Sequence, residues 1–303
     1  MFYNLRNKIN YFRFNRAAKA ILQTPSVTYE SGTPVVCVSQ VCHRDILMYL
    51  VAIKSFVRFV IPKKVYVLDD TSLKEEDKKI IREQIGNVEI IPITHIENEK
   101  CPAGGTWERL LFISDCVKDS YIIQLDSDTL TAKDITEVAE SVRDNRSFTL
   151  ATWVGQQIEP MKEACQNVKS SKSSHVQIVS EKNFDRIPGY ERLKYIRGCA
   201  AFAGFAKGSF SREEVKEFSL MMNKIIGTVW SNWGSEQLTS NYIVANCPSA
   251  MALPYPKYAG FKPERSYKES SFLHFMGTYR FKNSVYTEMA KDAIRELTIY
   301  PHG

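Results

Sequence analysis

The chain has 303 residues, of which 44% are hydrophobic and 24% are charged, which is the composition of a globular protein with a sizeable core. The net charge of +6 suits anionic partners, but basic residues mix with aromatic ones only at the N-terminus, so no nucleic-acid binding is predicted. No apolar run approaches the roughly 20 residues of a membrane-spanning helix, and the N-terminus lacks the apolar stretch of a secretory signal.

Cysteine usage indicates a reducing compartment. The seven cysteines are scattered, odd in number and without a Cys-x-x-Cys pair, and several lie in apolar runs, as Cys37 does. This pattern is typical of reduced, mostly buried thiols. We therefore predict a cytoplasmic protein with neither a disulfide framework nor a zinc site.

Residues 1–24 differ from the rest of the chain because they hold five basic residues and no acidic one. Apolar side chains recur there at helical spacing: Phe2, Leu5, Ile9 and Phe12. We expect an amphipathic helix. It either makes peripheral contact with an anionic membrane surface, packs on the main domain or docks a partner.

Strands and helices are predicted to alternate from residue 34 to residue 142. Short apolar runs predict strands over 34–39, 64–68, 88–93 and 121–125, and longer periodic segments predict helices over 45–60, 73–85, 106–117 and 135–142. This alternation is typical of an α/β fold with a mostly parallel sheet flanked by helices. Ligands of such sheets bind at the carboxyl ends of the strands.

The pattern loosens after about residue 150. Residues 155–190 are polar and are interpreted as a mobile loop or lid, or as a variable surface insertion. Residues 195–212 include a strand of small residues, which let a ligand or another backbone approach closely. A helix is expected from Gly234 to Asn246. We predict two parts: a basic helix and linker over 1–32, and one α/β domain over 33–303.

Two carboxylates, Asp126 and Asp128, directly follow the predicted strand that ends at Leu125. Because the chain turns where the strand ends, both can converge on one ion. Hard divalent cations prefer oxygen ligands, and a metal held in this way would stabilise a diphosphate leaving group. The alternative is a polar loop in which an aspartate caps the next helix.

The same segment resembles the first motif of the haloacid-dehalogenase phosphatases, in which the first aspartate is a covalent nucleophile. In that family the motif lies on an early strand, whereas three strand–helix units precede it here, and no close acidic pair follows it. A phosphatase is therefore the main alternative from another class. A nucleotidyltransferase is disfavoured because Ser39 to His43, after the first strand, contain no glycine.

Four blocks in the same order resemble the GT-A fold glycosyltransferases, particularly glycosyltransferase family 8, which includes glycogenin and bacterial galactosyltransferases. They are Thr106–Leu111 with an aromatic-x-Arg-Leu pattern, Tyr121–Leu130 with Asp-x-Asp, Ser235–Leu238 like an Asp-Gln motif, and His274–Arg280 like His-x-x-Gly-x-x-Lys. The chain departs from the family at three places: Arg197–Ala200 instead of Asn-x-Gly, Glu236–Gln237 instead of Asp-Gln, and Arg280–Lys282 instead of Lys-Pro-Trp.

The resemblance implies a metal-dependent transferase of hexose from a nucleotide-sugar donor, a UDP-sugar being favoured, to a glycan or other hydroxyl acceptor. The basic N-terminus and the thiol pattern suggest a role in surface-polysaccharide assembly. Mn²⁺ or Mg²⁺ would be bound by Asp126, Asp128 and His274. Glu236 and Gln237 would be the catalytic pair beside the acceptor. Residues after the strands and in the blocks would bind the donor: Ser39, Gln40, Asp69, Asp70, Arg109, Asp126, Ser127, Asp128, Arg280 and Lys282.

Several alternatives stay open. A family 8 enzyme retains the anomeric configuration, whereas Glu236 acting as a general base would give inversion. His274 is otherwise a core histidine, and Trp230 and Trp233 either stack on an acceptor sugar or belong to the core. A non-catalytic relative that binds nucleotide sugars is the remaining hypothesis. The basic N-terminus would place a cytoplasmic enzyme at the inner membrane face.

Overall fold

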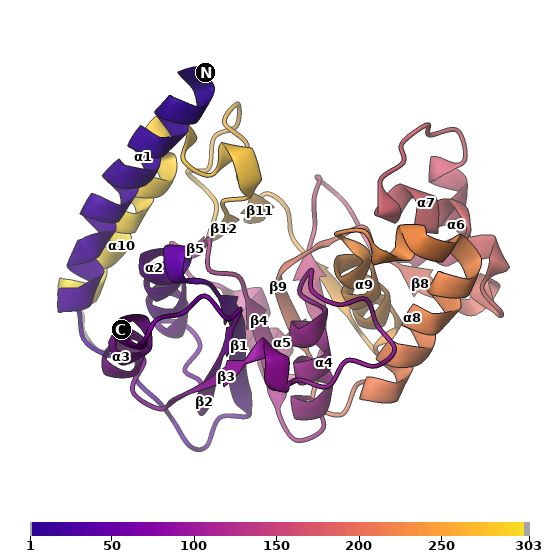
Figure 1. Ribbon diagram of the computed structural model, residues 1–303, viewed down its shortest axis with the longest axis horizontal. Coiled ribbons are helices and arrows are strands. Elements are labelled where there is room, and N and C mark those ends of the chain that lie inside the picture. Colours follow the sequence, from indigo (N-terminus) through magenta and orange to yellow (C-terminus); the bar gives the residue numbers. More distant parts are fainter. Residues whose placement is uncertain (1, 300–303) are drawn as a thin grey trace.

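The computed structural model describes the backbone of residues 2–299 and the side chains of residues 8–299 (Figure 1). Phe2 and Leu5, two of the expected apolar positions of the N-terminal helix, therefore lie outside the described side chains. No helix within the described residues is long and apolar enough to cross a membrane.

A seven-stranded sheet forms the centre of the molecule, in the strand order β10-β6-β9-β4-β1-β2-β3. Neighbouring strands pair in parallel, except that β9 runs antiparallel to both β4 and β6. The predicted mostly parallel sheet is confirmed. The strands are β1 (Val35–Val41), β2 (Lys64–Asp69), β3 (Val88–Pro92), β4 (Tyr121–Leu125), β6 (Phe148–Leu150), β9 (Cys199–Phe205) and β10 (Met251–Leu253).

Helices cover both faces of this sheet because its central strands are apolar on both sides. In β1, Val35 and Cys37 belong to one buried cluster, whereas Val36 and Val38 belong to another. The first face is covered by α2 (Ile46–Val57), α3 (Glu75–Ile85), α5 (Thr136–Arg143) and α10 (Val285–Ile299). The second is covered by α4 (Trp107–Cys116), α8 (Arg212–Ile226) and α9 (Ser235–Asn246).

A second, three-stranded sheet joins the segment after β4 to the C-terminal part of the chain. It contains β5 (Thr129–Thr131), β12 (Phe272–His274) and β11 (Tyr258–Gly260). In the antiparallel pairing of β12 with β5, His274 lies opposite Thr129. This register brings the end of β12 next to the loop that follows β4.

Residues 155–190 are not the mobile loop or lid that their polarity predicts. They contain α6 (Met161–Val168) and α7 (Val176–Lys182), and the short strand β7 (Glu159–Pro160) pairs with β8 (Lys194–Tyr195). Met161, Val176 and Phe184 are buried in the second cluster. These few apolar anchors fix the segment to the core while its many polar side chains face solvent.

The N-terminal helix α1 (Phe2–Ala18) lies along α10 (Figure 1). Phe14 is fully buried, and its ring centroid is 5.5 Å from that of Phe281 and 4.3 Å from that of Tyr286. One side of α1 is thus packed on the main domain. Lys54 anchors the following linker, since its Nζ donates to the Thr24 carbonyl at 3.2 Å and to the Gln84 side chain at 2.6 Å.

Strand β9 packs so closely against its neighbours at Gly204 that a methyl group added there should destabilise the protein. A Cβ at Gly204 would lie 2.6 Å from Tyr121 Oη and closer still to the Phe148 ring. We expect Gly204→Ala to lower the free energy of unfolding by about 1–3 kcal/mol, because overpacking forces neighbours to shift. Urea denaturation measures this. Gly32→Ala, whose added Cβ would meet its nearest atom at 4.0 Å, is the control and should be near neutral.

Candidate active site

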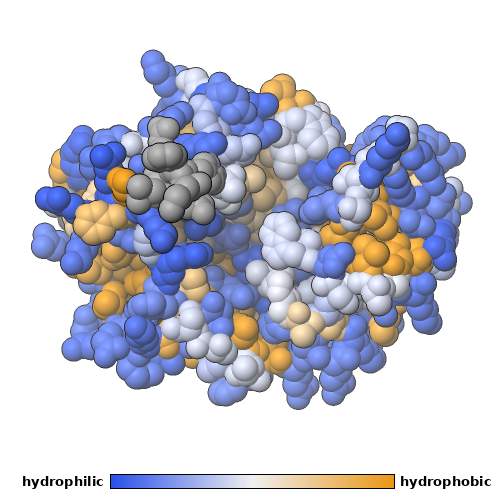
Figure 2. All heavy atoms as spheres, turned by 45° about the horizontal axis from the view of Figure 1, so that its top comes forward, coloured by the Kyte–Doolittle hydropathy of each residue, from blue (hydrophilic) through white to orange (hydrophobic). Residues whose placement is uncertain are grey.

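A cleft with a volume of about 750 Å³ opens at the carboxyl ends of β1 and β4. Figure 2 shows this face hollowed between two lobes. The antiparallel β9 also contributes, because its first residues lie at the same edge of the sheet. Thr106 and Gly234, which immediately precede α4 and α9, line the cleft, so two helix N-termini face it. Such ends favour bound anions.

Asp126, Asp128 and His274 meet in this cleft, with one potential ligand atom from each within 4.8 Å of the others. The Asp128 carbonyl accepts from the Phe275 backbone N–H at 2.8 Å, and the Asp126 N–H donates to the Ala201 carbonyl at 2.8 Å. Backbone pairing with β9 and β12 therefore fixes both aspartates. The structure brings together the three side chains that the sequence assigns to a metal.

Asp128 lies between two cationic groups. Its Oδ1 is 3.3 Å from His274 Nε2 and its Oδ2 is 2.5 Å from Arg280 Nη2. Burial would raise the pKa of Asp128, but His274 and Arg280 lower it to about 2. Burial would lower the pKa of His274, yet Asp128 and Cys199 hold it well above its ordinary range.

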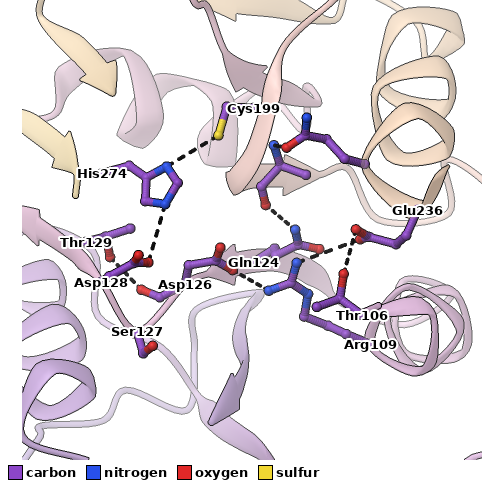
Figure 3. Close-up of polar contacts among 12 residues, drawn as sticks. Thr106, Arg109, Gln124, Asp126, Ser127, Asp128, Thr129, Cys199, Glu236 and His274 are labelled. Carbon is purple, nitrogen blue, oxygen red and sulfur yellow. Dashed lines mark hydrogen bonds and ion pairs between the residues drawn. The ribbon is translucent and has the colours of Figure 1, made fainter. Parts of the chain in front are cut away.

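These groups fit a divalent cation. Two carboxylates and one imidazole are a donor set that suits Mn²⁺, and carboxylates with substrate phosphates suit Mg²⁺. Positive charge is already favoured beside Asp128, and a metal would take the place of the proton on His274. Cys199 Sγ lies 3.4 Å from His274 Nδ1 and orients the imidazole so that Nε2 faces Asp128 (Figure 3).

A second charge cluster adjoins the first. Arg109, on α4, has a side chain only 4% exposed; its Nη1 donates to Asp126 and its Nη2 lies 3.7 Å from Glu236 Oε1 (Figure 3). Thr106 Oγ1 donates to Glu236 Oε2 at 2.7 Å. The pKa of Glu236 is raised to about 7, because burial and the nearby Asp126 raise it more than Arg109 and Thr106 lower it. Arg109 is thus a buried link between two carboxylates.

The structure places most of the sequence-predicted site residues on the cleft wall. Besides the three potential metal ligands and Arg109, the residues Gln40, Asp70, Ser127, Glu236, Gln237 and Arg280 line it. Gln237 Oε1 accepts from the Ala200 backbone N–H at 3.4 Å.

Ser39, Asp69 and Lys282 do not line the cleft. Strand β1 continues to Val41, and its alternation turns Ser39 into the core, where it is fully buried. Asp69 Oδ1 accepts from the N–H groups of Thr71 and Leu73, at 2.8 and 3.2 Å, and so shapes the turn after β2. Lys282 Nζ stacks 4.7 Å over the ring of Tyr279.

The two tryptophans near α9 have different surroundings. Trp230 is buried, donates to Ser219 Oγ at 3.0 Å and packs on Trp107, so it is a core residue that does not line the cleft. Trp233 lines the cleft with 74% of its surface exposed. An exposed aromatic ring at a cleft rim is suited to stacking on an apolar ligand face.

Sequence reasoning missed Thr106 and Cys199 as site residues. Thr106 precedes α4 with a left-handed backbone, φ 74°, and this conformation directs its hydroxyl to Glu236, 130 positions away. Cys199 resembled the other cysteines in apolar surroundings. Its thiol comes within 3.4 Å of His274 Nδ1 only in the tertiary structure, where Cys199 pairs opposite Leu150 of β6.

No protein-family model matches the sequence, and a comparison with curated proteins finds no match. Solved structures are similar in fold. An active-site mutant of LgtC shares 12% identity over 88% of this chain and 99% of that chain, with a TM-score of 0.54. The bifunctional glycosyltransferase WbbM shares 13% identity, with a TM-score of 0.49. Core-mannan synthase A of Aspergillus fumigatus, in its Mn/GDP form, shares 11% over 92% of this chain and 87% of that chain, with a TM-score of 0.45.

The likeness to LgtC establishes the fold. The chain has the GT-A fold, as the four sequence blocks predict. The region matched to WbbM is 88% of this chain but only 53% of the WbbM chain, so this chain spans about half the length of that bifunctional protein.

The raised pKa of Glu236 predicts a pH-dependent contribution to stability. The carboxyl titrates near its ordinary value of 4.5 in the unfolded chain and near 7 in the folded protein. Between these values the folded state binds more protons, so the free energy of unfolding falls as the pH rises. Glu236→Gln removes this titration. Relative to that of the wild type, we expect the free energy of unfolding of the variant to rise by on the order of 3 kcal/mol from pH 4.5 to pH 7.

Urea denaturation at a series of pH values measures this difference. Glu163→Gln, at an exposed position of α6, controls for the loss of one carboxyl group. A difference between Glu236→Gln and wild type that stays constant with pH would show that folding does not raise the pKa of Glu236.

Proposed function

We propose that the protein is a metal-dependent glycosyltransferase that moves a hexose from a nucleotide-sugar donor to a hydroxyl group of a glycan. The observation that carries the proposal is the convergence of Asp126, Asp128 and His274 in a large cleft of a GT-A fold. The preference for a UDP-sugar rests on the resemblance to family 8, and the role in surface-polysaccharide assembly rests on the basic N-terminus and the pattern of reduced thiols.

The donor end of the site is cationic where a diphosphate would need it. Asp126, Asp128 and His274 would hold Mn²⁺ or Mg²⁺, which when bound would stabilise negative charge on the leaving diphosphate. Arg280, which pairs with Asp128, would turn to the phosphate oxygens, as a guanidinium binds such oxygens well. Gln40, near the end of β1, and Asp70, directly after β2, would hold the nucleoside.

The acceptor end would be formed by the start of α9. Gln237 would orient the acceptor hydroxyl, and Trp233 offers an exposed ring for the apolar face of a sugar. Glu236 is engaged by Thr106 and Arg109, so it would mainly position Arg109 and Asp126. Together these side chains would hold donor and acceptor next to each other, which is a large part of the catalysis of a two-substrate reaction.

A phosphatase is supported less well. A covalent aspartyl phosphate would require a free nucleophile at Asp126, but this carboxylate pairs with the buried Arg109. The described residues contain one group of carboxylates and imidazole close enough to hold a metal, and it includes His274 from a distant strand. Release of inorganic phosphate from simple phosphate esters, without any sugar transfer, would favour the phosphatase.

Nucleotide binding is the first test. We expect a UDP-sugar to raise the melting temperature in the presence of Mn²⁺ but not in EDTA, and Asp128→Asn to lose this effect. A ligand at about 100 times its Kd adds about 2.7 kcal/mol to the free energy of unfolding. A panel of UDP, GDP, CMP and their sugars identifies the base. Asp185→Asn, at an exposed position, should respond as the wild type does. The proposal fails if no nucleotide stabilises the wild type.

The stereochemical course is the second test. Since Glu236 is held by Thr106 and Arg109 rather than free to accept the acceptor proton, we expect transfer with retention. Proton NMR of the first product formed reads the anomeric configuration directly. Inversion would instead assign Glu236 the role of general base, and Glu236→Gln should then lower kcat by about 10²–10⁴-fold.

A further inference from the structure

The outer face of α1 is an exposed surface of mixed basic and apolar character. We define it by the side chains that point away from α10: Lys8, Ile9, Phe12, Arg13 and Arg16, all exposed. Phe12 has 68% of its surface exposed and Ile9 has 44%, although large apolar side chains are otherwise mostly buried here. The inner face already packs on the domain through Phe14 and Ala18, both fully buried.

No ion pair among the described residues neutralises the positive charge of this face. The sequence has no acidic residue before Glu30. Among the described residues, no carboxylate forms an ion pair with Lys8, Arg13 or Arg16. The neighbouring helix α10 does not supply one, because its carboxylates are paired elsewhere. These pairs are Arg58 with Glu296, Lys291 with Glu288, and Arg295 with Asp292.

Helix α1 is hydrogen-bonded to two segments that lie next to the cleft. Asn10 Nδ2 donates to the Phe281 carbonyl at 3.1 Å, next to Arg280, which lines the cleft. Tyr11 Oη donates to the Arg44 carbonyl at 2.9 Å, between the cleft residues Cys42 and Asp45. A partner bound to the outer face of α1 would therefore lie close to the entrance of the cleft.

We propose that the outer face of α1 binds the surface of an anionic phospholipid membrane. Lys8, Arg13 and Arg16 contact lipid phosphates, and Phe12 and Ile9 enter the interface between headgroups and acyl chains. Exposed aromatic and aliphatic side chains among unpaired cations match such a surface in both charge and polarity. Binding there holds the cleft beside the membrane, where an acceptor carried by a lipid would be presented.

Vesicle binding tests this directly. Full-length protein is floated with vesicles of phosphatidylcholine alone and of equal parts phosphatidylcholine and phosphatidylglycerol. We expect binding only to the second, and we expect it to weaken with salt. The double variant Arg13→Gln/Arg16→Gln should bind about 25-fold more weakly, since each basic residue near the surface contributes about fivefold. Phe12→Ser should bind about tenfold more weakly, through loss of apolar burial.

The matched control is Lys162→Gln/Lys172→Gln, which removes the same charge from exposed positions on or after α6 and should bind as the wild type does. Unchanged melting temperatures and unchanged nucleotide stabilisation in the absence of vesicles separate this proposal from the proposed transferase activity. It is overturned if the wild type does not float with anionic vesicles, or if the α1 variants and the control bind equally.

Discussion

The molecule is organised around the compensation of negative charge at the carboxyl end of β4. Asp126 and Asp128 follow a strand that is buried along its whole length, and a carboxylate in such a place is costly unless cations pair with it. Arg109 from α4, His274 from β12 and Arg280 from the segment after β12 supply these pairs. Parts of the chain that are far apart in sequence are thereby drawn to one point. The cleft lies where they meet.

The same charges give the site two ends. Around Asp128 the cations exceed the carboxylates, which suits a metal and then the phosphates of a donor. Around Arg109 the carboxyl groups exceed the cations, because one guanidinium lies between Asp126 and the buried Glu236. The pKa of Glu236 is raised to about 7. Arg109 therefore couples the two ends: a cation arriving at Asp126 competes with Arg109 and changes the field at Glu236. Donor and acceptor chemistry would be linked through this single side chain.

Helix α1 packs next to this site with one face and exposes the other. Its inner face is held by Phe14 between Phe281 and Tyr286, and its polar side chains bind backbone groups next to the cleft. The amphipathic helix expected from the sequence thus has apolar side chains on two faces. One face packs on the domain, and the other, with Phe12 and Arg16, remains exposed.

The sequence by itself predicted the α/β alternation, and its resemblance to a known family predicted the GT-A fold and the assignment of Asp126, Asp128, His274 and Arg280 to one site. These predictions rest on local signals, since apolar periodicity and short motifs can be identified within a single segment of the sequence. It did not determine that Ser39 and Asp69 turn away from the cleft, that residues 155–190 contain two α-helices packed on the core, or that Thr106 and Cys199 belong to the site. Those outcomes depend on strand register and on pairing between distant segments. Only the tertiary structure decides such contacts, because side chains along a strand alternate and one residue of register moves a group from the cleft to the core.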